Sequence, residues 1–348
     1  MKIEMGIFGD INGEQVKSYT LINDQNMKMT CIDYGCIITR IDVSDKEGNV
    51  ENIVLGFDDL EDYVHSSPYF GAVIGRVAGR ISPPTIGIEG ITYKLPQNEG
   101  QNHLHGGPYG FHNVVWKSSS CEGIDQASVI FTYMSSDGEA GYPGNLEVSV
   151  IYTLTNNNEL IITYHGTSDK STLLNMTNHT YFNLSGNLKE DILQHELTIK
   201  SDQFLELDQF LLPTGNLIDV EHTPFDFRAG KQIIEGTKTA YQQNKIVGNG
   251  YDHPFLLNEN NKKEICLIHY SSGRKMIVET DEPSVVLYTG NMLQNNIQLR
   301  GIPCKKHLGL CLETQHPPNA IHNKHFPSIY LEKNKEYHSR TCFTFTLT

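Results

Sequence analysis

Residues 146–164 read LEVSVIYTLTNNNELIITY, and this stretch decides the fold class. Every second residue from Leu146 to Leu154 is apolar, which is the period of a strand with one buried face. The turn-forming run 156–158, three asparagines, separates it from a second apolar run over residues 160–164. The stretch therefore predicts a β-hairpin.

The same signals recur on both sides of this hairpin. Residues 27–43 are rich in Thr, Ile, Cys and Tyr and are broken by a glycine, which favours a bent pair of strands. We expect a second hairpin over 263–279 and a last alternating strand over 342–347. Helix is indicated only over 58–64 and within 230–241, and both are short. The sequence predicts an all-β fold, a large antiparallel β-sandwich with few short helices.

Length and composition indicate one domain. The chain has 348 residues, which is enough for two domains of ordinary size. However, no Pro/Ser/Gly-rich linker and no change of composition divides it. Hydrophobic residues make up 38% and supply a core. We expect a single domain over residues 1–348.

Net charge and cysteine content limit the kinds of binding partner and the cellular compartment that we expect for this protein. The formal charge is −14, which disfavours nucleic acid and anionic membranes and favours a small neutral or cationic partner. No apolar run approaches the roughly 18 residues of a membrane span, and the first residues lack the apolar core of a signal peptide. None of the seven cysteines forms a Cys-x-x-Cys motif, so we expect reduced core thiols in a cytoplasmic protein.

Glu313 is the first candidate for chemistry. It follows the apolar run 308–312 and precedes Pro317 and Pro318, which end any regular strand. Ionised carboxylates are rarely buried without a partner. This segment alone favours a strand that surfaces at Glu313 over a functional carboxylate.

Two other segments carry polar groups of interest. Asn175, Thr177, His179 and Tyr181 would share one face of a strand, and such a face needs water or a ligand. Alone, this pattern favours a solvated face, although an imidazole exchanges protons near neutral pH. Asp252 lies in an aromatic setting before a proline that resists regular structure. A turn and a binding role are equally open for it.

Metal and phosphate sites are both disfavoured. His103 and His105 would share a face of an extended segment, but Tyr109 stands where a cupin-like metal site would need a glutamate. The glycines of 71–81 are not followed by a Gly-Lys-Ser/Thr ending, so we expect them to permit close backbone packing. We expect no metal at these residues.

Six motifs, in order, resemble those of the aldose 1-epimerase, or galactose mutarotase, family. They are GRVAGRI at 75–81, NHLHGG at 102–107, DGEAGYPG at 137–144, TNHTYFNL at 177–184, YTGN at 288–291 and LETQ at 312–315. Each alone is weak, but six in the family's order are specific and span nearly the whole chain. The resemblance implies a β-supersandwich that interconverts the α and β anomers of free aldohexoses such as galactose and glucose. It also implies that no metal or organic cofactor is used.

The resemblance assigns roles to single residues. Glu313 matches the family's general base and His179 its general acid. The expected substrate-binding residues are His105, Arg80, Asp252 and Tyr181.

Two positions depart from the family pattern. Gly79 stands where many members have an asparagine, and Val286 stands where some have a sugar-contacting glutamine. We expect these changes to affect the preferred sugar and not the reaction.

The reaction needs one base and one acid. Glu313 would accept the C1 hydroxyl proton while protonated His179 donates to the ring oxygen, and the roles reverse after rotation about C1–C2. Free histidine titrates near about 6.5, so we expect the site to raise the pKa of His179 through Asp252 or Glu313. The reaction rate should then show a bell-shaped dependence on pH.

Two other classes of protein remain open. A glycoside hydrolase would use two carboxylates, and Asp252 with Glu313 could supply them. A sugar-binding or sensor protein would use the polar strand without a reaction. Whether a disaccharide or a phosphorylated sugar is accepted, and whether the chain is a monomer or a homodimer, is also left open.

Overall fold

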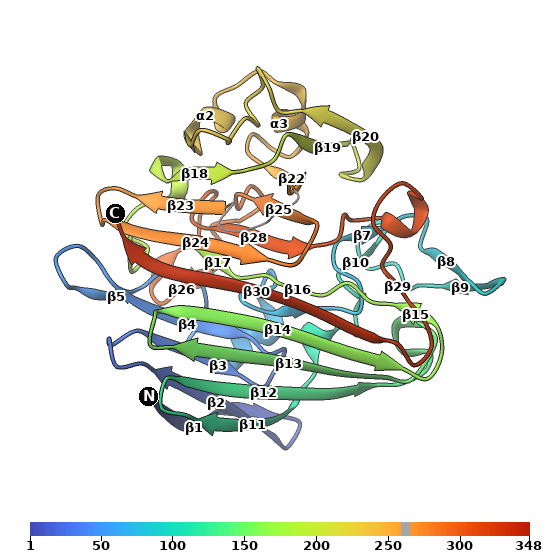
Figure 1. Ribbon diagram of the computed structural model, residues 1–348, viewed down its shortest axis with the longest axis horizontal. Helices are drawn as coiled ribbons and strands as arrows, with labels where there is room; N and C mark the ends of the chain where they lie inside the picture. Colours follow the sequence, from blue (N-terminus) through green and yellow to red (C-terminus); the bar gives the residue numbers. More distant parts are fainter. Residues whose placement is uncertain (259–264) are drawn as a thin grey trace.

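The computed structural model describes residues 1–258 and 265–348, and it consists mainly of antiparallel strands (Figure 1). Three short α-helices occur among these residues: α1 (Leu60–His65), α2 (Ile234–Thr237) and α3 (Gln242–Ile246). Single turns of 3-10 helix are η1 (Phe111–Asn113), η2 (Glu139–Gly141), η3 (Ile192–Gln194) and η4 (Ala320–His322). The predicted all-β fold with few short helices is confirmed. No helix in the described ranges has the length and apolarity to span a membrane.

The largest sheet has nine strands among the described residues, and it joins the two halves of the chain. Its order is β11 (Lys117–Glu122), β12 (Gln126–Ser135), β13 (Leu146–Thr155), β14 (Glu159–Ser168), β30 (Glu336–Leu347), β24 (Arg274–Thr280), β23 (Ile265–His269), β18 (Glu196–Ile199) and β21 (Lys231–Gln232). The C-terminal strand β30 lies between β14 and β24 (Figure 1). Both predicted hairpins, β13–β14 and β23–β24, are confirmed. Lys263 and Glu264, expected to begin the second hairpin, lie outside the described residues.

Two further sheets pack with the first. A six-stranded sheet has the order β17 (Tyr181–Phe182), β28 (Leu310–Gln315), β25 (Ser284–Tyr288), β22 (Asp252–Leu256), β19 (Gln203–Leu207) and β20 (Pro213–Asp219). A five-stranded sheet contains β1 (Lys2–Ile11), β2 (Glu14–Ile22), β3 (Lys28–Ile32), β4 (Ile38–Ser44) and β5 (Val50–Asn52). The bent pair expected over 27–43 is β3 and β4.

Short strand pairs lie outside these three sheets. They are β6 (Val73–Ile74) with β16 (Thr177–Asn178), β7 (Arg80–Ile81) with β10 (His103–Leu104), β8 (Thr85–Ile88) with β9 (Ile91–Lys94), β15 (Thr172–Leu173) with β29 (Tyr330–Leu331), and β26 (Gln298–Leu299) with β27 (Ile302–Pro303).

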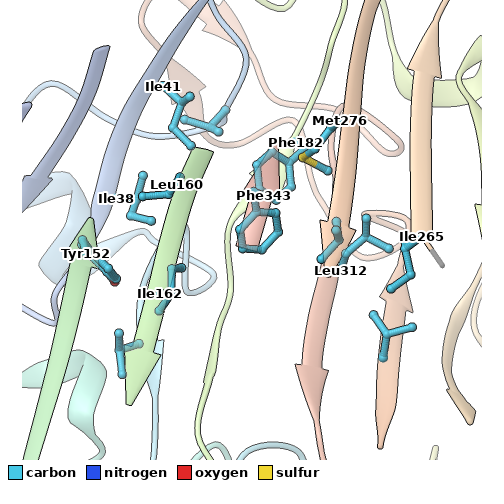
Figure 2. Close-up of a cluster of buried hydrophobic side chains, with 14 of the residues drawn as sticks. Ile38, Ile41, Tyr152, Leu160, Ile162, Phe182, Ile265, Met276, Leu312 and Phe343 are labelled. Atoms are coloured by element: carbon cyan, nitrogen blue, oxygen red, sulfur yellow. The ribbon is translucent and has the colours of Figure 1, made fainter. Parts of the chain in front are cut away.

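The main hydrophobic core draws on all three large sheets. In Figure 2, Ile38 of β4 lies near Tyr152, Leu160 and Ile162 of β13 and β14. Phe182 packs on Phe343 with ring centroids 5.4 Å apart. Along β13 and β14 these buried side chains alternate with more exposed ones, so the period-two pattern places them in one core.

Two expectations about local structure are wrong. The segment from Asn175 to Tyr181 is not one strand with a solvated face, because β16 pairs with β6 while β17 pairs with β28. His179 lies in the break between β16 and β17, and all four residues of the expected face are buried. Pro254 does not interrupt regular structure, since it lies within β22 opposite Val286. The neighbouring strand β19 pairs with β22 only beyond this proline, so no ladder hydrogen bond is lost there.

Candidate active site

A cavity of about 380 Å³ brings together all six residues that the sequence singled out. They come from separate segments of the chain: Arg80, His105, His179, Tyr181, Asp252 and Glu313. The glutamate is therefore not where its strand surfaces, as the segment alone favoured. It is 4% exposed and lines the cavity.

Strand register places the two carboxylates. Within the six-stranded sheet, Glu313 of β28 lies opposite Val286 of β25. Asp252 begins β22 and lies opposite Tyr288 of the same central strand. Because side chains two residues apart point to the same face, Val286 and Tyr288 share a face, and both line the cavity between the carboxylates.

Glu313 and His179 form the closest contact between a histidine and a carboxylate among the described residues that line the cavity. Nε2 of His179 lies 3.5 Å from Oε1 of Glu313. The imidazole stacks on Tyr69, with centroids 5.7 Å apart, and on Tyr181, with centroids 5.1 Å apart. Its Nδ1 lies 3.4 Å from Sγ of Cys311. The ring is thus held on its faces and at both nitrogens.

Burial sets the protonation of this pair. It raises the pKa of Glu313 well above its ordinary value, and the charge of Asp252 adds to the rise while Arg80 opposes it. Burial also lowers the pKa of His179 to about 4. The expectation that the site raises the pKa of His179 is wrong, because burial lowers it and the backbone hydrogen bond of His179 opposes this only in part. In the free protein burial therefore favours the neutral form of both groups.

Arg80 is oriented by a residue that the sequence did not suggest. Its Nε and Nη2 donate to the two carboxylate oxygens of Glu99, at 2.7 and 2.6 Å. Burial alone would lower the pKa of Arg80, but the Glu99 hydrogen bonds and the charge of Asp252 raise it. The guanidinium therefore stays charged beside Asp252, whose own pKa is raised by burial and partly restored by Arg80.

His105 is fixed as a hydrogen-bond donor. Strand β10 ends at Leu104, and His105 takes a left-handed backbone conformation with φ 52°, so it does not share an extended face with His103. Its Nδ1 accepts a hydrogen bond from the backbone N–H of Gly79 at 3.2 Å. The proton of the neutral ring therefore lies on Nε2. His103 is instead hydrogen-bonded to Tyr142 and the Pro96 carbonyl.

The position of the His105 proton on Nε2 also affects whether the site can bind a metal ion. The potential ligand atoms of His105, His179 and Glu313 lie within 4.8 Å of one another, which is close enough for one ion. While His105 accepts from Gly79, however, it has no free lone pair, because Nδ1 is occupied and Nε2 carries the proton. The donor set therefore fits hydrogen bonding to sugar oxygens better than metal ligation.

The two departures from the family pattern both line the cavity. Gly79 has φ 77°, and a Cβ built there would lie 2.8 Å from Cβ of Pro318. Val286 is 8% exposed and presents an apolar surface next to Glu313. The side chains at these two positions cannot form a hydrogen bond with a sugar hydroxyl.

Four site residues were missed: Tyr69, Glu99, Cys311 and Gln315. Alternation along β28 would have indicated Cys311 and Gln315, which lie two residues before and after Glu313. Tyr69 and Glu99 approach the site only through long-range folding, and no local pattern marks them. The hydroxyl of Tyr181 donates to the Pro68 carbonyl, so this residue presents mainly its ring to His179.

Comparisons with known proteins agree with this site. The model of the family described as aldose 1-epimerase matches residues 17–344. The chain is 40% identical to galactose mutarotase of Bos taurus, over 100% of this chain and 99% of that protein. It is 34% identical to aldose 1-epimerase of Escherichia coli K12, over 96% of each. The solved structure of galactose 1-epimerase from Lactobacillus acidophilus superposes with a TM-score of 0.88 at 30% identity, covering 99% of both chains.

Proposed function

The chain belongs to the aldose 1-epimerase family and interconverts sugar anomers, and we propose that Glu313 and His179 carry the proton transfers of this reaction. The observation that carries this assignment is the 3.5 Å contact between Nε2 of His179 and Oε1 of Glu313 inside the cavity. We further propose galactose and glucose as substrates, in keeping with the mammalian relatives named galactose mutarotase.

The pair holds one exchangeable proton between its two members. The neutral pair and the Glu⁻/His⁺ ion pair contain the same number of protons, and one transfer between the facing atoms converts the first into the second. In the ion pair Glu313 accepts the C1 hydroxyl proton while His179 donates to the ring oxygen. The raised pKa of Glu313 makes its carboxylate a stronger base, and the lowered pKa of His179 makes its imidazolium a stronger acid.

The other polar residues position the sugar. Nε2–H of His105 and the guanidinium of Arg80 donate to hydroxyl oxygens and to negative charge that develops on oxygen. Asp252, beside Arg80, accepts hydrogen bonds from sugar hydroxyls. The opened aldehyde rotates about C1–C2, and the reversed transfers close the ring without a covalent intermediate.

We also propose that residues 1–348 act as one domain, as a monomer or homodimer in the cytoplasm, without nucleic-acid or membrane partners. The insertion of C-terminal β30 between β14 and β24 supports one domain. All seven cysteines are free, which suits a reducing compartment.

Polarimetry of fresh α anomers tests the substrates. Galactose, glucose, xylose and maltose are each followed with and without the protein at equal concentration. Faster approach to equilibrium for galactose and glucose supports the proposal. Tight binding of galactose without acceleration would favour a sugar-binding protein. Release of reducing sugar from a galactoside without anomer exchange would favour a hydrolase.

A further inference from the structure

Tyr69 brings an unused hydroxyl to the active-site cavity. Three tyrosines are among the described residues that line this cavity: Tyr69, Tyr181 and Tyr288. The hydroxyl of Tyr181 donates to the Pro68 carbonyl at 3.1 Å, and that of Tyr288 accepts from the backbone N–H of Met292 at 2.9 Å. The hydroxyl of Tyr69 has no hydrogen bond to any residue that the structure describes, and the side chain is only half-buried. A group that can donate and accept is therefore free where the substrate binds.

The backbone at Tyr69 adopts a conformation that is rare for a tyrosine. Its φ is 65°, in the left-handed region, where a Cβ crowds the neighbouring carbonyl oxygen. Glycine would adopt the same conformation without this strain. Strained backbone of this kind gathers at ligand sites, where a particular side chain is needed in a particular place. The conformation therefore points to a role for the side chain of Tyr69.

Hydrogen bonds hold the turn that carries Tyr69 against His179. The backbone N–H of Gly71 donates to the carbonyl of His179 at 3.0 Å, and the backbone N–H of His179 donates to the carbonyl of Ala72 at 2.9 Å. The phenol ring stacks on the ring of His179, with centroids 5.7 Å apart, and meets that of His105 edge-on, with centroids 4.8 Å apart. The hydroxyl is thus held at one place relative to the imidazole.

The charges around Tyr69 make its hydroxyl a donor. Burial raises the pKa of Tyr69, the charge of Glu99 adds to the rise, and that of Arg80 opposes it. The phenol therefore keeps its proton over the working range of pH. Both charges act on the phenol because it lies near the pair that Arg80 forms with Glu99, and all three residues line the cavity. Tyr69 and Arg80 thus offer neighbouring donors to a bound sugar.

We propose that Tyr69 is a further substrate-binding residue, whose hydroxyl donates a hydrogen bond to one sugar hydroxyl other than that on C1. The inference rests on the proton transfers proposed above, in which the C1 hydroxyl faces Glu313 and the ring oxygen faces His179. The oxygen left for Tyr69 is therefore one of the hydroxyls on C2, C3, C4 or C6. The stacked ring holds the side chain in place, and the hydroxyl recognises the sugar.

Removing each partner of this hydrogen bond tests the proposal. Tyr69→Phe removes the hydroxyl and keeps the stacked ring, while 2-deoxy-, 3-deoxy-, 4-deoxy- and 6-deoxygalactose each lack one candidate hydroxyl. Tyr109→Phe is the control, because Tyr109 is 69% exposed and is not among the described residues that line the cavity. Mutarotation of galactose and of the deoxy sugars is measured as kcat and KM for wild type and for both variants.

We expect Tyr69→Phe to raise KM for galactose about 3- to 10-fold, the range that one neutral hydrogen bond would give, while kcat changes less than about twofold. On one deoxy sugar the variant and wild type should have the same KM, because the partner hydroxyl is already missing. On the other deoxy sugars the full increase should remain.

An unchanged KM for galactose overturns the proposal. So does an increase in KM that persists on every deoxy sugar, since a merely structural role of the phenol would act on all of them alike. An increase that Tyr109→Phe reproduces overturns it as well. If Glu313→Gln is itself fully active, the proposed proton transfers fail instead, and the comparison of sugars still decides the role of Tyr69.

Discussion

Nε2 of His179 lies 3.5 Å from Oε1 of Glu313, and the two side chains are only 6% and 5% exposed. An acid and a base this close, with both side chains buried, can exchange a proton with each other as well as with a bound sugar. Their burial shifts the pKa values of the pair in opposite directions. These two pKa shifts determine how the activity and the stability of the protein depend on pH.

The pH dependence of kcat/KM should be a broad bell. Below a pH of about 4, the pKa of His179, both groups are protonated and the pair has no base. Above the raised pKa of Glu313, the pair has lost its last proton and has no acid. Unshifted groups, with pKa values of 4.5 and 6.5, would give a narrow bell between those values. A bell confined between 4.5 and 6.5 would contradict the opposite shifts of the two pKa values.

Glu313→Gln should make the protein more stable than wild type at alkaline pH. The pKa of Glu313 is raised in the folded state, so its favourable contribution is complete below the unfolded value of 4.5 and is lost as the pH rises toward the folded value. Glutamine does not ionise, so the variant does not lose this stability as the pH rises. The difference in unfolding free energy should therefore grow with pH, by up to about 1.4 kcal/mol per pH unit. Urea unfolding of both proteins at pH 5 and pH 8 measures it, and a difference that does not grow would count against the raised pKa.

Glu99→Gln should weaken sugar binding more than it slows the reaction. The amide keeps only one acceptor for the Arg80 guanidinium, so that side chain loses its fixed orientation. We expect KM for galactose to rise about 3- to 10-fold, while kcat changes less than about twofold. The exposed Glu332→Gln is the control, and it should leave both constants unchanged. Equal losses in kcat and kcat/KM would place Glu99 in the reaction step instead.

Gly79→Asn should destabilise this protein, although many relatives are expected to carry asparagine there. Asparagine tolerates the left-handed backbone, but its Cβ would lie 2.8 Å from Pro318. We expect a loss of about 1–3 kcal/mol in unfolding free energy. Gly13→Asn is the matched control, because Gly13 has φ 88° and no atom within 4 Å of a built Cβ. Equal losses in both variants would show that the backbone, and not Pro318, sets the cost.

The hairpins and the all-β class were predictable because alternation of apolar residues is a local signal. The strand break at His179 was not predictable, since β16 and β17 pair with different strands that are distant in sequence. The sign of the pKa shift of His179 was wrong for a related reason. Resemblance to a family indicates which carboxylates lie near His179. It does not indicate how completely folding removes water from the imidazole ring.

The family resemblance identified the six cavity residues but not the residues that hold them. Glu99 reaches Arg80, and Tyr69 reaches His179, through contacts that only the folded chain creates. Such contacts depend on distance in space, and neither spacing nor composition reports them. Cys311 is the exception, because alternation along β28 relates it directly to Glu313.

The most direct test compares wild type with Glu313→Gln by NMR exchange spectroscopy of α- and β-galactose at pH 7. The amide fills the same space but cannot accept the C1 hydroxyl proton. We predict that wild type accelerates the exchange and that the variant loses about 10²- to 10⁴-fold of that acceleration while still binding galactose. A variant that exchanges the anomers as fast as wild type would contradict the assignment of Glu313 as the base.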